Sequence, residues 1–188
     1  MKVLIAEDET LIRLDLRGML ENAGLEVCAE ARDGVEAIEL AGTAGPDLAL
    51  LDVKMPRLDG IEAARRILEE RPMPIVMVSA FTERSLVARA AEAGVFGYLA
   101  KPFREEDLLP AIATARARFE QLAEVREHVD SLAEALAARK AIERAKGLLM
   151  ESQNLSEQEA FVRLRRASQS SGRPMRVIAE AIVETLGQ

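Results

Sequence analysis

The chain has 188 residues, of which 49% are hydrophobic and 30% charged, and its formal net charge is −7. Its one cysteine, Cys28, and its one histidine, His128, exclude a disulfide framework and a Cys- or His-rich metal site, and they argue against a Ser-His-Asp triad. The first apolar run ends at Glu7, so we expect no signal peptide, and no run approaches the ~20 apolar residues that span a bilayer. We therefore expect a soluble, cytoplasmic protein with one or two small domains.

The first half of the chain alternates short apolar runs with helical patterns. The runs are mostly continuous, as in strands buried on both faces of a parallel sheet, and they predict strands at 2–6, 25–31, 48–52, 75–79 and 96–99. The segments between them carry apolar residues three and four apart, which is typical of amphipathic helices. Two of these segments begin with Asp-Gly-x-Glu, at Asp33 and Asp59, where the aspartate can cap the helix. The alternation predicts an α/β fold, a doubly wound, flavodoxin-like, five-stranded parallel sheet.

Polar residues stand where four of the predicted strands end. Glu7 and Asp8 follow the first strand, Asp52 ends the third, Ser79 ends the fourth, and Lys101 follows the fifth. In open α/β sheets ligands bind outside these carboxyl ends. Converging carboxylates repel one another unless a cation such as Mg²⁺ joins them, and a carboxylate can also accept a phosphoryl group. We therefore predict a Mg²⁺ site with a phosphoryl acceptor, to which Lys101 and Ser79 would supply a positive charge and a hydroxyl.

From residue 105 onward no strand signal recurs, and the composition up to residue 140 favours helix. Five apolar residues in this stretch are spaced 3-4-3-4, as in a coiled coil: Leu122, Val125, Val129, Leu132 and Leu136. We predict a helical connector, residues 119–138, that dimerises through this seam; the alternative is a helix that packs on its own domain.

Three shorter helices are predicted after the connector, over 141–152, over 156–170 and up to Leu186, and they form a small all-α domain. The second begins with a capping box at Ser156, and Phe161 fits its core face. If that ring faces the core, the tail has no exposed aromatic residue, which excludes the class of RNA-binding domain that stacks bases on an aromatic sheet surface. Any base stacking would then have to use the planar guanidinium groups of arginines.

Charge is distributed unevenly. Residues 1–110 carry a net charge of −8, whereas residues 139–176 carry +5. The basic segment suits phosphate contacts. The tail has no Gly-rich phosphate loop, no metal-ligand spacing and no catalytic set, so we predict a binding domain and no enzyme.

The motifs LIAEDE, LLDVKMPRLDG, MVSAF and GYLAKPF make residues 1–118 resemble the receiver domain of two-component response regulators. The resemblance implies that a histidine kinase phosphorylates Asp52. It implies Mg²⁺ ligation by Asp8, Asp52 and the Lys54 backbone carbonyl, with Glu7 acting through water. It also implies that Ser79, Tyr98 and Lys101 respond to the phosphoryl group, and that the side chains of Lys54 and Phe81 tune its lifetime. Glu7 stands where the family more often has Asp, and Ser79 where it has Thr.

The tail, in which we predict a domain at residues 139–188, resembles the ANTAR domain over about residues 125–188 through AIERAKGLLM, AF-x-x-LR-x-x-S and VIAE. This resemblance implies an antiterminator that binds paired hairpins in nascent mRNA leaders, with phosphorylation promoting a homodimer. We expect RNA contacts from basic residues of the tail, and no membrane or DNA partner. The predicted contacts are Arg144, Lys146, Arg165, Arg166 and Arg173. The alternatives are a DNA-binding response regulator and a switch that binds a protein partner.

Overall fold

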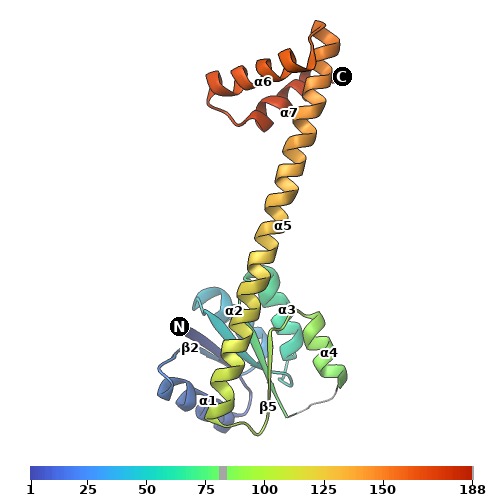
Figure 1. Cartoon of the computed structure of the whole chain (residues 1–188). Helices are drawn as coiled ribbons and strands as arrows, with labels where there is room; N and C mark the ends of the chain where they lie inside the picture. Colours follow the sequence, from blue (N-terminus) through green and yellow to red (C-terminus); the bar gives the residue numbers. More distant parts are fainter. Residues whose placement is uncertain (81–83, 188) are drawn as a thin grey trace. The chain divides into compact units, whose positions relative to one another are not determined.

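The computed structural model describes residues 1–80 and 84–187, with the backbone alone at 84, 85 and 87. The chain divides into two compact units, Met1–Ala123 and Glu124–Gln188, and each has a buried core of its own (Figure 1).

The first unit contains a parallel five-stranded sheet in the order β2-β1-β3-β4-β5. Its strands are β1 (Lys2–Ala6), β2 (Glu26–Ala31), β3 (Leu48–Asp52), β4 (Ile75–Ser79) and β5 (Gly97–Ala100). Its helices are α1 (Thr10–Asn22), α2 (Gly34–Thr43), α3 (Gly60–Glu70), α4 (Arg84–Glu92) and the first part of α5 (Glu105–Gln153). The predicted doubly wound α/β fold is confirmed, and every predicted strand is present with its ends within one residue.

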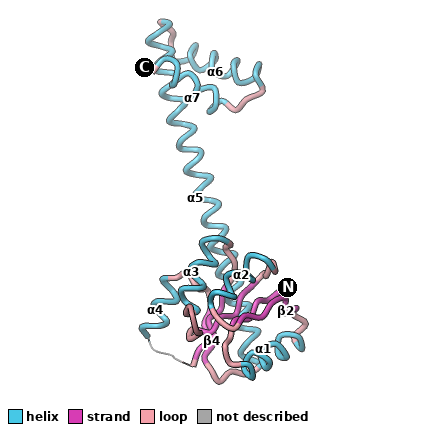
Figure 2. Tube along the Cα trace, turned by 180° about the vertical axis from the view of Figure 1, so that it is seen from behind, coloured by secondary structure: helices cyan, strands magenta, loops and turns pink. Residues whose placement is uncertain are grey.

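Helices cover both faces of the sheet, as Figure 2 shows around the magenta strands. Leu16 and Leu20 of α1 and Leu108 and Ile112 of α5 pack on one face. Residues of α2, α3 and α4, such as Ile67, pack on the other. Strands β3 and β4 are buried throughout, which explains their continuous apolar runs.

The predicted helix caps are confirmed and fix where the helices begin. The Asp33 carboxylate accepts hydrogen bonds from the Val35 and Glu36 amides in the first turn of α2, and Asp59 accepts one from the Glu62 amide in the first turn of α3. Ser156 and Glu159 form the predicted capping box at the start of α6 (Glu157–Ser171).

The second unit contains the end of α5, α6 and α7 (Met175–Leu186). The predicted separate helix at 141–152 is the last part of α5, because no glycine or proline interrupts the chain between 111 and 146. The buried core of the second unit consists of Ala145, Leu149, Ala160, Leu164 and Ala179.

Two further findings concern exposure. The expectation that Phe161 faces the core is wrong: its neighbours Ala160 and Leu164 fill that position, and Phe161 is 42% exposed. Over the described residues, no helix combines the length and the apolar character that a membrane crossing requires.

Candidate functional site: an acidic pocket and a basic helical unit

Three carboxylates meet at the carboxyl ends of β1 and β3. Glu7 and Asp52 are buried and Asp8 is exposed, and one oxygen from each lies within 4.8 Å of the others. The two strands are neighbours, and the helices that follow them, α1 and α3, lie on opposite faces of the sheet, so the two loops part and open a crevice. A set of carboxylate oxygens that is partly open to solvent suits a hard divalent cation such as Mg²⁺.

Lys101 bridges the two buried carboxylates. Its Nζ donates to Glu7 Oε2 at 2.6 Å and to Asp52 Oδ2 at 3.0 Å. Burial raises the pKa of Glu7, Lys101 partly offsets this, and the nearby Asp52 charge raises the pKa again. Burial alone would lower the pKa of Lys101, but its bonds to Glu7 and Asp52 outweigh burial and raise it. The lysine is therefore held charged beside Asp52.

The other predicted pocket residues lie on neighbouring elements. Ser79 is fully buried at the end of β4, and Tyr98 of β5 is half-buried against the core on the α3–α4 face. Lys54 is exposed in the loop after β3, and the Lys101–Pro102 peptide bond is cis. Phe81 lies outside the described residues.

A supporting arginine of α1 was not predicted. Arg13 of α1 is buried, donates to the Glu7 backbone carbonyl at 2.6 Å and pairs with Glu30 at 3.4 Å, so it fixes the loop that carries Glu7. Its spacing of three from the buried Leu16 was the available signal, but a charged residue at a core position is easily assigned to the surface.

Gly60 is required at the other side of the pocket. A Cβ built on it would lie 1.8 Å from the Asp52 carbonyl oxygen, so only glycine lets α3 begin this close to β3.

The loop between β3 and α3 is also clamped to α2. Arg57 has a left-handed backbone, with φ of 62°, and its guanidinium pairs with Asp33. Burial would raise the pKa of Asp33, but the bonds from Arg57 and from two α2 amides lower it below its ordinary value. One aspartate therefore caps a helix and anchors the loop that holds Lys54.

The predicted seam residues are open to solvent. Residues 121–137 of α5 are exposed throughout, and the five seam side chains are 38–71% exposed: Leu122, Val125, Val129, Leu132 and Leu136. None of the five belongs to the buried core of either unit. An apolar row at heptad spacing is left without an intramolecular partner in the described part of the chain.

Among the predicted RNA-contact residues, four arginines are exposed, and none has an ion-pair partner within residues 1–80 and 84–187: Arg144, Arg165, Arg166 and Arg173. Lys146 differs, because it is only 8% exposed. Its Nζ lies 2.6 Å from Glu157 Oε1 and 2.9 Å from Glu143 Oε2, and these partners raise its pKa. Lys146 thus ties the end of α5 to the start of α6.

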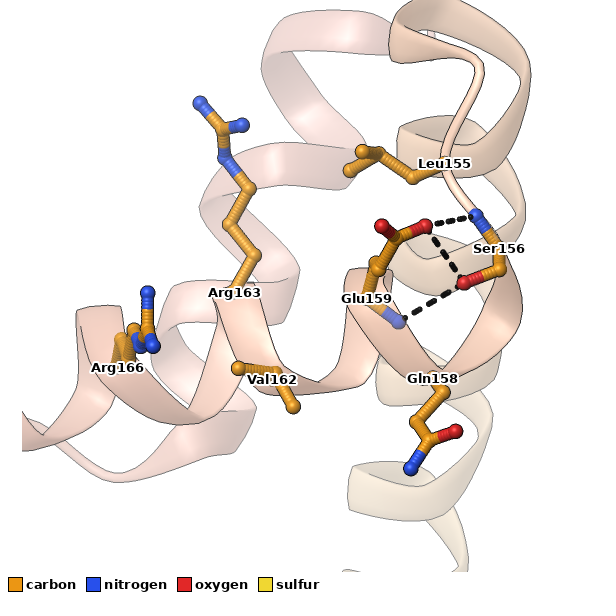
Figure 3. Close-up of a pocket in the computed structure, with 7 residues that line it drawn as sticks. All are labelled: Leu155, Ser156, Gln158, Glu159, Val162, Arg163 and Arg166. Atoms are coloured by element: carbon orange, nitrogen blue, oxygen red, sulfur yellow. Dashed lines mark hydrogen bonds between the residues drawn. The ribbon is translucent and has the colours of Figure 1, made fainter.

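A shallow hollow of about 790 Å³ lies beside the first turns of α6. Figure 3 shows Arg163 and Arg166 projecting from the same side of the helix, with Leu155 and Val162 close by. Arg163 was counted as basic but not predicted as a contact. Its spacing of three from Arg166 places both guanidinium groups on one face.

Two family models match the chain. The response regulator receiver domain matches residues 3–113, and the ANTAR domain matches residues 130–183.

Known proteins are similar to nearly the whole chain or to about two thirds of it. "Transcriptional regulatory protein PdtaR" of Mycobacterium tuberculosis (strain ATCC 25618 / H37Rv) is 49% identical over 186 residues, which cover 99% of this chain and 91% of that protein. The signal receiver domain of a modulated diguanylate cyclase from Desulfovibrio desulfuricans G20 superimposes with a TM-score of 0.60 at 34% identity, over 64% of this chain and 96% of that one. The CheX-CheY-BeF3-Mg²⁺ complex from Borrelia burgdorferi gives a TM-score of 0.57 at 26% identity, over 60% and 86%. The chain belongs to the response regulators in which a receiver domain is followed by an ANTAR domain.

Proposed function

We propose that this protein is a phosphorylation-controlled antiterminator of the cytoplasm. Its receiver domain takes a phosphoryl group from a histidine kinase onto Asp52, and its ANTAR domain binds paired hairpins in nascent mRNA leaders and prevents termination. The observation that carries the proposal is the Glu7–Asp8–Asp52 cluster, in which Lys101 bridges Glu7 and Asp52, on a chain whose residues 130–183 match the ANTAR domain.

The pocket residues divide the chemistry among them. One Asp52 oxygen would form the bond to phosphorus as the phosphorus–nitrogen bond of a phosphohistidine breaks. Asp8, Asp52 and the Lys54 carbonyl, with Glu7 through water, would hold Mg²⁺, which neutralises charge on the transferred group when bound. Lys101, already 3.0 Å from Asp52, would contact the phosphoryl oxygens. Ser79 and Tyr98 would rearrange in response.

Dimerisation would connect the two activities. The exposed seam on α5 offers a second copy an apolar row, and two ANTAR domains in one dimer would bind two hairpins of the same transcript with avidity. The exposed arginines of the second unit would contact RNA phosphates, and Lys146 would hold α5 and α6 in position.

The test is filter binding of a two-hairpin leader RNA, with duplex DNA as competitor, in the presence of Mg²⁺ with and without beryllium fluoride, a phosphoryl mimic. We expect the mimic to strengthen RNA binding by wild type but not by Asp52→Asn, and acetyl phosphate to label wild type alone.

A second variant tests dimerisation. Leu132→Lys, which places a charge in the seam, should bind the mimic normally but should remain a monomer in analytical ultracentrifugation.

Each result bears on a separate part of the proposal. RNA binding that is equally strong with and without the mimic would support the RNA-binding function but overturn its control by phosphorylation of Asp52. Stronger binding to duplex DNA than to RNA would replace the output with the DNA-binding alternative. Labelling of Asp52→Asn at the wild-type level would show that another residue accepts the phosphoryl group.

A further inference from the structure

Phe161 is the sole phenylalanine, tyrosine or tryptophan between positions 124 and 188. Ala160 and Leu164 of the same helix are fully buried, whereas Phe161 is 42% exposed, so the core of the second unit closes without its ring. Single exposed apolar side chains are common on protein surfaces. The charges around the ring therefore decide what it is suited to bind.

Glu157, Phe161 and Arg165 follow one another at one-turn intervals on α6, and we call this row the Phe161 flank. Arg165 is exposed, and its guanidinium has no ion-pair partner in the described parts of the chain. The Glu157 carboxylate is paired with Lys146 at 2.6 Å, and this pairing lowers the pKa of Glu157. The flank thus offers an aromatic face next to an available positive charge, with its carboxylate already neutralised.

This combination suits an unpaired nucleotide. A base stacks on an aromatic face whatever its identity, and the adjoining phosphate forms charge-assisted bonds with a guanidinium. Bases within a paired stem are already stacked on one another, so only the loop of a hairpin offers a base to this ring. An apolar protein surface fits less well, because covering Arg165 without a counter-charge would cost free energy.

We propose that the Phe161 flank stacks an unpaired loop base of the bound hairpin, with Phe161 supplying the ring face and Arg165 the contact to the adjacent phosphate. The inference rests on the RNA binding proposed above and adds the two side chains that would meet an unpaired base and its phosphate. It also replaces the expectation that stacking would have to rely on arginine planes alone.

The test compares variants of the full chain with Mg²⁺ and beryllium fluoride present. The probes are a two-hairpin leader RNA and an RNA duplex of the same stem sequence without loops. Phe161→Leu keeps an apolar side chain but removes the aromatic face. We expect it to weaken hairpin binding about 5- to 100-fold and to leave duplex binding unchanged. Leu186→Ala on α7, which is 39% exposed and lies outside the hollow beside α6, is the control and should bind hairpins as wild type does.

A second variant gives a direct signal. The chain has no tryptophan, so Phe161→Trp introduces one emitter, and we expect hairpin RNA to quench it while loopless duplex does not. Equal binding by Phe161→Leu and wild type, with no quenching in Phe161→Trp, would overturn the stacking role while leaving RNA binding intact. Absence of hairpin binding by wild type would overturn the proposed function and the stacking role together. An emission change on adding beryllium fluoride without RNA would assign the flank to a protein contact.

Discussion

Leu164→Ala tests whether the second unit depends on its small core. Leu164 is fully buried, and its cluster contains one other leucine, Leu149, and three alanines. Removing three carbons forfeits about 2.4 kcal/mol of transfer free energy at ~0.8 kcal/mol per methylene. The alanines are too short to fill the space, so a cavity term raises the expected loss of unfolding free energy to about 3–4 kcal/mol.

The assay is urea unfolding followed by far-UV circular dichroism, with the two units resolved as separate transitions. Domains of this size have unfolding free energies of roughly 5–10 kcal/mol. The loss should therefore lower the urea midpoint of the second unit strongly and weaken RNA binding. Beryllium fluoride binding by the receiver should be unchanged. Val162→Ala, on the exposed side of the same helix, should change the unfolding free energy by less than about 0.5 kcal/mol. A shift in Leu164→Ala no larger than in this control would refute the assignment of the core.

Two further substitutions test the receiver. Gly60→Ala should abolish beryllium fluoride binding, measured by fluorine NMR, because its Cβ would collide with the Asp52 carbonyl; Gly18→Ala, with nothing within 4 Å of the new methyl, should bind normally. Asp33→Asn should destabilise the receiver at neutral pH, because it removes the anion that Arg57 pairs with. In the folded state the pKa of Asp33 lies below its ordinary value of 3.8. The loss of unfolding free energy in Asp33→Asn should therefore be complete above pH 3.8 and should vanish as the pH falls through the folded-state pKa. A loss in urea unfolding that stays constant with pH would contradict the pairing.

The sequence predicted the receiver more fully than the tail, and the physical reason lies in how each buries its residues. Strands such as β3 are apolar along their whole length and end in acidic residues, so the fold and the pocket follow from one pattern. Arg13 and Arg57 were missed because their roles depend on partners far along the chain, Glu30 and Asp33 respectively.

In the tail, adjacent residues on one amphipathic helix compete for a narrow core stripe. Ala160 and Leu164 occupy it, and Phe161 lies about a quarter turn away, beyond its edge. Hydrophobicity alone placed the largest apolar side chain inward, whereas the limited space between α5, α6 and α7 favours alanine there. An error of one helical position therefore concealed an exposed aromatic residue in a basic segment.

Lys146 shows why a motif residue that weakens RNA binding when it is replaced need not touch RNA. Its ammonium lies within 3.0 Å of two carboxylates, and Lys146→Ala would leave Glu157 unpaired at the edge of the Phe161 flank, where it would repel phosphate. Loss of binding in this variant therefore fits both a contact and a positioning role. Lys146→Met combined with Glu157→Gln separates the two, because it removes the cation and the nearer carboxylate together. A positioning role predicts that the double variant recovers most of the RNA affinity lost in Lys146→Met, whereas a direct phosphate contact predicts no recovery and a smaller salt dependence of binding.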